Sequence, residues 1–73
     1  MKSAVAECEE MELRLLLEAI YQKYHYDFRD YAKASIKRRL SKAKERFDCP
    51  SLSMLQHKVL HDPSLLPQLL PFL

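Results

Sequence analysis

Glycine is absent from this chain of 73 residues. Gly-rich phosphate loops, dinucleotide-binding fingerprints and two-residue hairpin turns all use backbone angles that only glycine reaches without strain. Helices have no such need, so we expect an all-α fold. A chain this short buries only ~60% of its unfolded surface, and catalytic folds usually need ~100 residues or more. Residues 1–73 are therefore predicted to form a single helical domain without a catalytic centre.

Apolar residues at helical spacing predict a small bundle of about four helices. The first is expected over about 9–24, the second over 30–47, the third over 51–61, and a short last helix after Asp62 and Pro63. We expect Asp27 or Asp30 to cap the second helix, Ser51 the third and Asp62 the last. The predicted core positions are Leu13, Leu16, Leu17, Ile20, Tyr24, Ala32, Ile36, Leu40, Ala43, Phe47, Leu52, Leu55 and Val59.

Two apolar features fall outside this core pattern. Leu15 and Tyr21 lie beside the main stripe of the first helix, where they either broaden the buried face or form a contact surface for a missing neighbour. An aromatic cluster surrounds the first connection, and we expect it to hold the first helix to the second rather than to stack on bases. The cluster consists of Tyr21, Tyr24, Tyr26, Phe28 and Tyr31.

The apolar C-terminal segment predicts a larger parent protein. Its large apolar residues are Leu65, Leu66, Leu69, Leu70, Phe72 and Leu73. We expect these side chains to form a face for a following domain, and an exposed patch of this kind favours self-association. Residue 73 is accordingly interpreted as a cut point in a longer chain.

Charge is distributed unevenly along the chain. The net charge is −3 over residues 1–28, +6 over residues 29–46 and −1 over residues 47–73, which gives +2 in all. On a helical wheel one flank of the second helix carries a group of cations about 200–300° from Ile36. This group is Arg38, Arg39, Lys42 and Arg46, while Lys33, Lys37 and Lys44 take the other flank. The pattern predicts either an anionic partner or an ordinary solvated helix face.

The remaining chemical motifs are weak. His57 and His61 stand at the i, i+4 spacing of two metal ligands, but no further ligand follows at a recognised spacing, so no metal site is expected. No pattern indicates a catalytic residue. Cys8 and Cys49 are expected to be free thiols of a cytoplasmic protein, because the chain shows no export signal and no membrane-spanning stretch.

Four segments together carry a resemblance to a known family. They are LLEAIYQKY at 16–24, YDFRDY at 26–31, SIKRRLSKAKERF at 35–47 and SLSMLQHKVLHDP at 51–63. Their order and spacing resemble the N-terminal helical domain of the chemotaxis receptor methyltransferase (CheR) family. Members of that family often carry glycine where His25 stands, and more arginine across 42–45.

The resemblance implies a function for the parent protein. Family members transfer a methyl group from S-adenosylmethionine to glutamate side chains on the cytoplasmic signalling helices of chemoreceptors. It implies a downstream α/β methyltransferase domain, which would hold the cofactor, so no cofactor-binding residue is expected here. Arg39 is the best-matched receptor-contact position, with Arg38, Lys42 and Arg46 as its neighbours. No nucleic acid and no membrane insertion are expected.

Two other functions are compatible with the residues alone. A basic helix can neutralise several phosphates, so a stand-alone nucleic-acid binder is possible, although an acidic first helix would repel a nearby duplex. A protein adaptor that docks through its apolar C-terminal segment is the third hypothesis.

Overall fold

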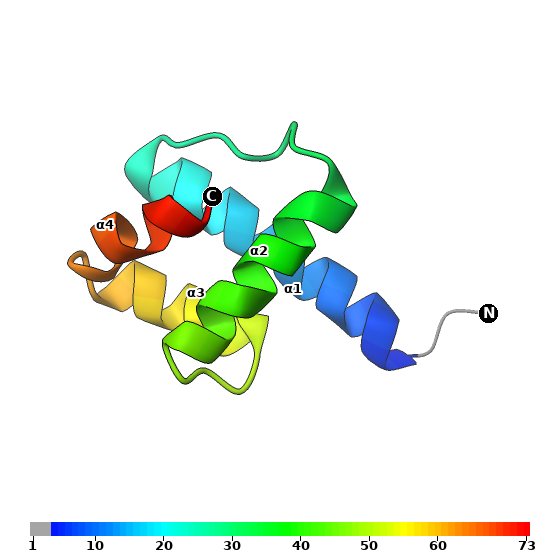
Figure 1. The fold of residues 1–73 in the computed structure, drawn as a ribbon. Coiled ribbons are helices and arrows are strands. Elements are labelled where there is room, and N and C mark those ends of the chain that lie inside the picture. Colours follow the sequence, from blue (N-terminus) through cyan, green and yellow to red (C-terminus); the bar gives the residue numbers. More distant parts are fainter. Residues whose placement is uncertain (1–3) are drawn as a thin grey trace.

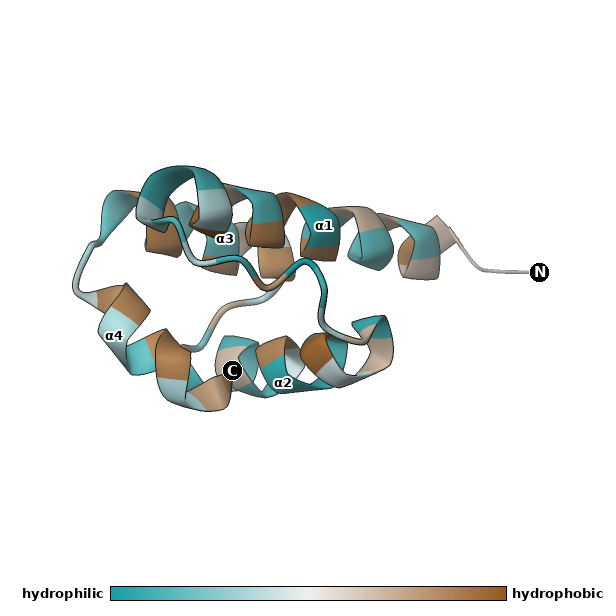
Figure 2. Ribbon diagram, turned by 90° about the horizontal axis from the view of Figure 1, so that it is seen from above, coloured by the Kyte–Doolittle hydropathy of each residue, from teal (hydrophilic) through white to brown (hydrophobic). Residues whose placement is uncertain are grey.

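The computed structural model describes residues 4–73, and within this range the chain is helical without a strand. The elements are α1 (Ala4–Tyr24), α2 (Lys33–Arg46), α3 (Leu52–His61), α4 (Leu65–Leu69) and the 3₁₀ helix η1 (Leu70–Phe72). They form two layers, with α1 packed along α3 in one layer and α2 beside α4 and η1 in the other (Figures 1 and 2). The predicted all-α bundle is confirmed.

The core lies between these two layers. Its fully buried side chains are Leu16, Ile20, Ile36, Leu40, Leu55, Val59 and Leu69. The apolar stripes of α1, α2 and α3 thus face inward as their periodicity predicted, and brown segments line the space between the layers in Figure 2. Three positions differ: Ala32 is exposed just before α2, and Tyr24 and Phe47 are only half-buried.

Hydrogen bonds tie α1 to α3 at both ends of their contact. A Glu12 carboxylate oxygen accepts from the backbone N–H of Ser53 at 3.0 Å, and the Tyr24 hydroxyl donates to the Val59 carbonyl at 2.7 Å. Lys23 also donates to the carbonyl of Leu60. These contacts give Tyr24 a partner on α3, whereas the predicted aromatic cluster was expected to join α1 to α2.

Three members of the aromatic cluster, Tyr26, Phe28 and Tyr31, lie on the connection before α2, whereas Tyr21 belongs to α1. Phe28 packs partly against the core and meets the Tyr31 ring edge-on, with 5.5 Å between centroids, while Tyr26 stacks on its other side at 6.2 Å. Tyr26 and Tyr31 remain exposed. The cluster is therefore real, but only Phe28 anchors this connection in the apolar core.

The first two helices start at other residues than predicted. Helix α1 begins at Ala4 rather than near Glu9, since its N-terminal alanines also favour helix. Neither Asp27 nor Asp30 caps α2, which starts at Lys33 after Ala32 without a side-chain cap. Asp27 is occupied by Arg29 instead.

Of the two caps predicted before α3 and α4, the first is confirmed and the second is wrong. The Ser51 hydroxyl accepts from the Met54 N–H at 3.1 Å, as predicted. Asp62 does not cap α4, because its carboxylate accepts from both the N–H and the hydroxyl of Ser64, and the helix begins only at Leu65. Such an Asx turn satisfies the aspartate locally before the helix starts.

Two non-glycine residues take left-handed backbone angles. His25 ends α1 with φ 65°, and its N–H donates to the Tyr21 carbonyl at 2.9 Å. Asp48 follows α2 with φ 58°. Helices commonly end in this conformation with glycine, so this glycine-free chain uses an imidazole and a carboxylate side chain at these positions.

The prediction of an exposed apolar C-terminal face is wrong. Leu65, Leu66 and Leu69 are buried in the core, and the remaining apolar residues of this segment pack partly against it. Phe72 meets Phe47 edge-on with 6.0 Å between ring centroids, which holds η1 against the end of α2. The three helices α1–α3 leave part of their apolar surface open, and this segment covers it.

Within residues 4–73, no helix combines the length and apolar character needed to cross a bilayer. Cys8 is exposed on α1, Cys49 is buried after α2, and both are free thiols.

Candidate functional site

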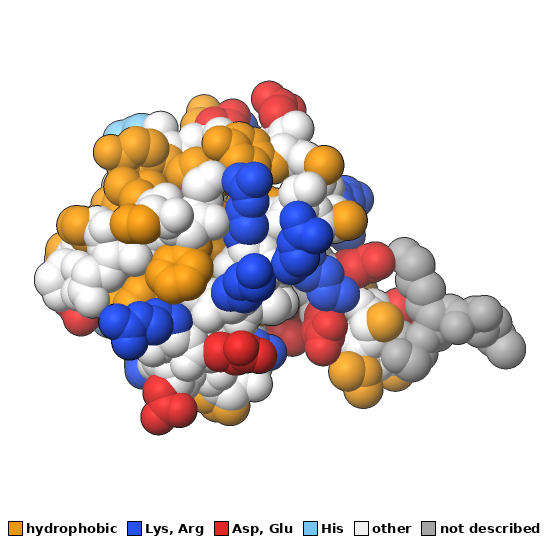
Figure 3. Space-filling model, viewed as in Figure 1, with side chains coloured by type: hydrophobic (Ala, Val, Ile, Leu, Met, Phe, Trp, Pro, Cys, Tyr) orange, Lys and Arg blue, Asp and Glu red, His pale blue; other side chains and the backbone are white. Residues whose placement is uncertain are grey.

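The strongest candidate site lies on the outward side of α2. We call the four predicted contact residues, Arg38, Arg39, Lys42 and Arg46, the cationic face. All four are exposed, whereas Ile36, Leu40 and Ala43 on the opposite side of α2 are fully buried. Helical periodicity produces this separation, because every third or fourth residue is apolar and turns the cations outward. Figure 3 shows blue side chains gathered over α2.

The cationic face lacks neutralising carboxylates. Among residues 4–73, Arg38, Lys42 and Arg46 have no hydrogen-bond or ion-pair partner. Arg39 donates to the main-chain oxygen of Leu73 at 2.9 Å. Like charges spaced four residues apart on a helix repel by about 0.2–0.5 kcal/mol per pair. The surface is thus ready to bind an anion that would relieve this repulsion.

The other flank of α2 is different, because α1 brings acids against it. Lys37 forms an ion pair with Glu9 at 3.2 Å. Lys44 lines a small cavity of about 110 Å³ together with Glu9 and Glu12. The sequence places cations on both flanks, and on this flank the structure pairs Lys37 with Glu9 within the domain. The cationic face has no such ion pair among residues 4–73, so it is the better candidate for an external partner.

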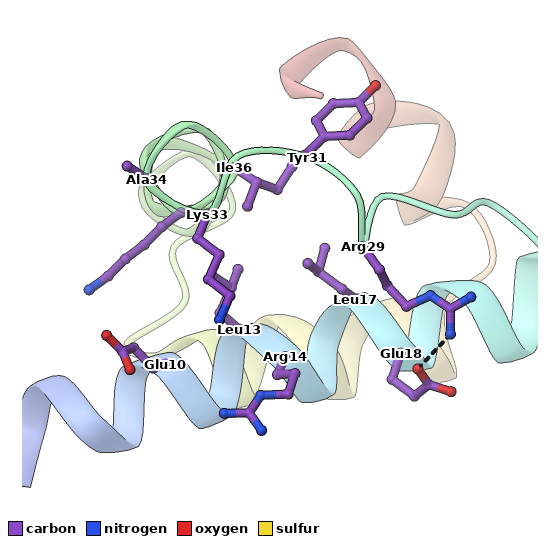
Figure 4. A pocket seen from close by; sticks show the side chains of 11 residues that line it. Glu10, Leu13, Arg14, Leu17, Glu18, Arg29, Tyr31, Lys33, Ala34 and Ile36 are labelled. Atoms are coloured by element: carbon purple, nitrogen blue, oxygen red, sulfur yellow. Dashed lines mark hydrogen bonds and ion pairs between the residues drawn. The ribbon is translucent and has the colours of Figure 1, made fainter.

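A second concavity lies between α1 and the start of α2. This groove has a volume of about 580 Å³ and an apolar floor formed by Leu13, Leu17 and Ile36 (Figure 4). Its rim carries both signs of charge, including the cations Arg14 and Lys33 and the acids Glu10 and Glu18. A rim of mixed sign gives no electrostatic preference for one class of ligand, so the groove is a weaker candidate than the cationic face.

Arg29 closes one end of this groove with a network that joins the α1–α2 connection to α1. Its guanidinium donates to both carboxylate oxygens of Asp27, at 2.9 and 3.0 Å, and to Glu18 at 3.2 Å. It also lies over the Tyr21 ring, with 3.9 Å between the guanidinium carbon and the ring centroid. Asp27 is exposed and Glu18 and Tyr21 are half-buried, so the network fixes the connection without burying charge.

These contacts shift the titration of the acids. Hydrogen bonds from the Arg29 side chain and backbone lower the pKa of Asp27 to about 2. The pKa of Glu18 is lowered first by the hydrogen bond from Gln22 and then by Arg29. The pKa of Arg29 is raised, chiefly by its hydrogen bonds to Asp27. The network is consequently fully charged throughout the neutral range.

The histidine pair forms a contact on the exposed side of α3. The rings of His57 and His61 lie 4.3 Å apart between centroids, with their planes tilted by 39°. Within residues 4–73, no three histidine, cysteine, aspartate or glutamate side chains gather in a way that could hold a metal ion.

Sequence reasoning missed the Arg29 network and the pairing of Glu9 with Lys37. The local signal for the first was an aspartate two residues before an arginine, a spacing that permits the Asx-type contact of the Arg29 N–H with Asp27. The second depends on which face of α1 passes α2, and periodicity within one helix carries no such information.

Comparisons with known proteins agree with this architecture. Residues 11–73 match the family model described as "CheR methyltransferase, all-alpha domain". The chain is 58% identical over 64 residues to a protein of Pseudomonas putida named "Putative methyltransferase Cher3". That match covers 88% of this chain and 23% of the relative, so the chain spans about a quarter of the relative's length. No solved structure matches the chain.

Proposed function

The chain belongs to the CheR methyltransferase family, as its all-α domain, and from this membership we propose that it recognises chemoreceptors. In this proposal it is the N-terminal domain of an S-adenosylmethionine-dependent protein-glutamate O-methyltransferase. The cationic face binds the glutamate-bearing cytoplasmic signalling helices of bacterial chemoreceptors. A methyltransferase domain of the same protein then esterifies a receptor glutamate.

The observation that carries the proposal is the unpaired charge of the cationic face. Arg38, Lys42 and Arg46 follow one another at four-residue intervals, about 6 Å apart along the axis of α2. A partner helix with glutamates at the same interval would offer carboxylates in register with these cations. Charge-assisted hydrogen bonds to carboxylates are among the stronger polar contacts in proteins. A regular glutamate helix is therefore a good fit to this surface.

The position of residue 73 supports a role in catalysis by the parent protein. Leu73 lies within hydrogen-bond distance of Arg39, so the chain leaves η1 beside the cationic face. A domain that followed residue 73 would start next to the bound receptor helix. Proximity of this kind raises the local concentration of the reacting groups.

We assign the cofactor to the methyltransferase domain outside this chain. Close backbone approach to such a cofactor commonly uses a Gly-rich turn, and this chain contains no glycine. The described residues fit a recruiting surface, and the chemistry of methyl transfer lies with the other domain in this proposal.

Nucleic-acid binding is less well supported by the geometry. The two flanks of α2 differ in free charge, because Glu9 pairs with Lys37 on one of them. A helix in the major groove meets phosphates of both strands, which calls for cations on both sides. The adaptor hypothesis is weakened as well, because the apolar C-terminal residues that it requires are largely buried.

Charge reversal with a matched control tests the proposal. Lys42→Glu and Lys33→Glu make the same change on α2, the first on the cationic face and the second on the other flank. We expect Lys42→Glu to weaken binding of the 73-residue chain to the purified cytoplasmic fragment of a chemoreceptor by about tenfold or more. Lys33→Glu should change it less than about threefold, since surface attraction falls off within ~8 Å at physiological salt.

Isothermal titration calorimetry measures the two affinities, and circular dichroism checks that both variants keep the wild-type helix content. A receptor fragment with its methylated glutamates changed to glutamine should bind more weakly than the glutamate form. Equal affinities of the two charge variants would refute the proposal. Tighter binding to duplex DNA than to the receptor fragment would favour the nucleic-acid hypothesis instead.

A further inference from the structure

Helix α1 carries a second apolar stripe on the side that faces away from the core. Its two larger members are strongly exposed: Met11 is 58% exposed and Leu15 57%. Leu15 therefore does not broaden the buried face. The first turns of α1, blue in Figure 1, project past the other helices, so much of this stripe has no neighbour in the domain (Figures 1 and 2).

The spacing of this stripe is that of a short coiled-coil seam. Its residues are Ala4, Cys8, Met11 and Leu15, all exposed, and we call them the α1 seam. They alternate at intervals of four, three and four residues and fall within about 60° of arc at 100° per residue. The buried residues of α1 centre on the opposite side of the helix. The seam ends at the next positions of the pattern, where Glu18 and Gln22 hydrogen-bond to each other at 2.9 Å.

The charges beside the seam indicate what it fits. Glu7 and Arg14 are exposed on the same edge of the seam, and neither has a partner among residues 4–73. Consider an antiparallel pair of α1 helices in which Cys8 packs against Met11 of the other copy. In this register Glu7 of each copy lies opposite Arg14 of the other. A parallel pair would instead place Glu7 near Glu12, which is repulsive. The seam is thus self-complementary in one orientation only.

We propose that this chain forms an antiparallel homodimer through the α1 seam, with a second copy as the occupant. Ala4 packs against Leu15, and Cys8 against Met11, each contact occurring twice about a two-fold axis. Reciprocal Glu7–Arg14 pairs border the contact. The surface is distinct from the cationic face on α2, so a dimer can present two receptor-binding faces.

Part of this seam lies outside the family match, which begins at residue 11. Ala4 and Cys8 belong to the segment that precedes this match. The overlap of residues 4–15 is about 18 Å long and one helix wide. Stable interfaces usually bury ~800 Å² per partner, so we expect a reversible dimer with a dissociation constant on the order of 100 μM.

Sedimentation equilibrium on the 73-residue chain from about 10 μM to 1 mM tests association. The wild type should shift from monomer to dimer over this range, and Met11→Glu should weaken the dimer by about 100-fold or more. Met54→Glu, at an exposed position on α3, is the matched control and should leave the dimer intact. Wild-type chain that stays monomeric at 1 mM, or a dimer that survives Met11→Glu, overturns the proposal.

Charge exchange tests the orientation. Glu7→Arg and Arg14→Glu should each weaken the dimer by about tenfold, and the double variant should recover most of the wild-type affinity. Strengthening by Glu7→Arg alone would indicate the parallel pair and overturn the antiparallel one. As a second test, a mixture of wild type and the Cys8→Ser, Met11→Cys variant should form a mixed disulfide on oxidation. Dominant Cys8–Cys8 cross-linking of wild type would contradict this geometry.

Discussion

The guanidinium of Arg39 donates a 2.9 Å hydrogen bond to the carbonyl oxygen of Leu73. Arg39, which we propose as a receptor contact, therefore also holds the end of η1, so a substitution here changes both the fold and the proposed contact. Arg39→Glu removes the donor and places a carboxylate near a carbonyl oxygen, so it perturbs η1 as well as the charge of the cationic face.

Arg39→Gln separates the two functions. Its amide can still donate towards Leu73 but carries no charge, so we expect unfolding free energy within about 0.5 kcal/mol of wild type. Methylation of purified receptor by the parent enzyme should nevertheless fall several-fold, with a larger loss for Arg39→Glu. Methylation kinetics and urea unfolding measure the two effects. Wild-type kinetics in folded Arg39→Glu enzyme would show that the arginine serves only η1.

The Asp27–Arg29 pair predicts an acid-dependent contribution to stability. The pKa of Asp27 is lowered from 3.8 to about 2 by hydrogen bonds from Arg29. A lowered folded-state pKa stabilises the fold above the unfolded pKa, and that contribution is lost as pH falls from about 4 to 2. Thermal unfolding of Asp27→Asn should therefore depend less steeply on pH in this window. Parallel pH profiles for wild type and variant would contradict the prediction.

His25 should respond favourably to glycine. Its φ of 65° is strained for a residue with a Cβ, and glycine adopts this angle freely. We expect His25→Gly to stabilise the domain by about 0.5–1 kcal/mol, which raises the Tm by several degrees for a domain of this size. Asp48→Gly should gain less, because aspartate tolerates left-handed angles better. A lower Tm for His25→Gly would show that the imidazole makes a compensating contribution.

The buried C-terminal segment predicts sensitivity at Leu69, whose side chain is fully buried. Leu69→Ala leaves a cavity and should cost about 2–5 kcal/mol, a large part of the stability of so small a domain. Met54→Ala, at an exposed position, should cost less than about 0.5 kcal/mol. Chemical denaturation followed by circular dichroism compares the two. Equal, small losses would mean that η1 and α4 detach readily from the core.

Periodicity predicted the helices and most of the core because burial repeats every three or four residues along each helix. Leu16, Ile36 and Leu55 are buried as that pattern requires. The fate of the C-terminal leucines was not predictable in this way. Whether an apolar segment covers its own domain or a neighbour depends on how much surface α1–α3 leave open, which is a property of their packing.

The candidate site, too, was predictable only where helical periodicity decides it, and not where packing between helices does. The wheel correctly predicted that Arg38 and Lys42 would be exposed, and their role towards a receptor remains a prediction. The wheel could not distinguish the flank of Lys37 from the cationic face. The Glu9–Lys37 ion pair depends on how α1 packs against α2, and a wheel of one helix does not show this packing. The Arg29 network likewise forms only when the α1–α2 connection folds back over α1.

Because Cys49 is a buried free thiol, its alkylation rate measures how often the core opens. Its thiol is 7% exposed and lies among core side chains between α2 and α3, with the sulfur 3.6 Å from the Phe47 carbonyl. A maleimide can reach that sulfur only when these helices part, so the alkylation rate follows the population of the opened form when reclosure is fast. Cys8 is exposed in the single chain, so at concentrations well below those of the proposed dimer it reacts without any such delay. A single labelling experiment thus gives two quantities. Cys8 reports the intrinsic rate of the reagent, and Cys49 reports how often the core opens.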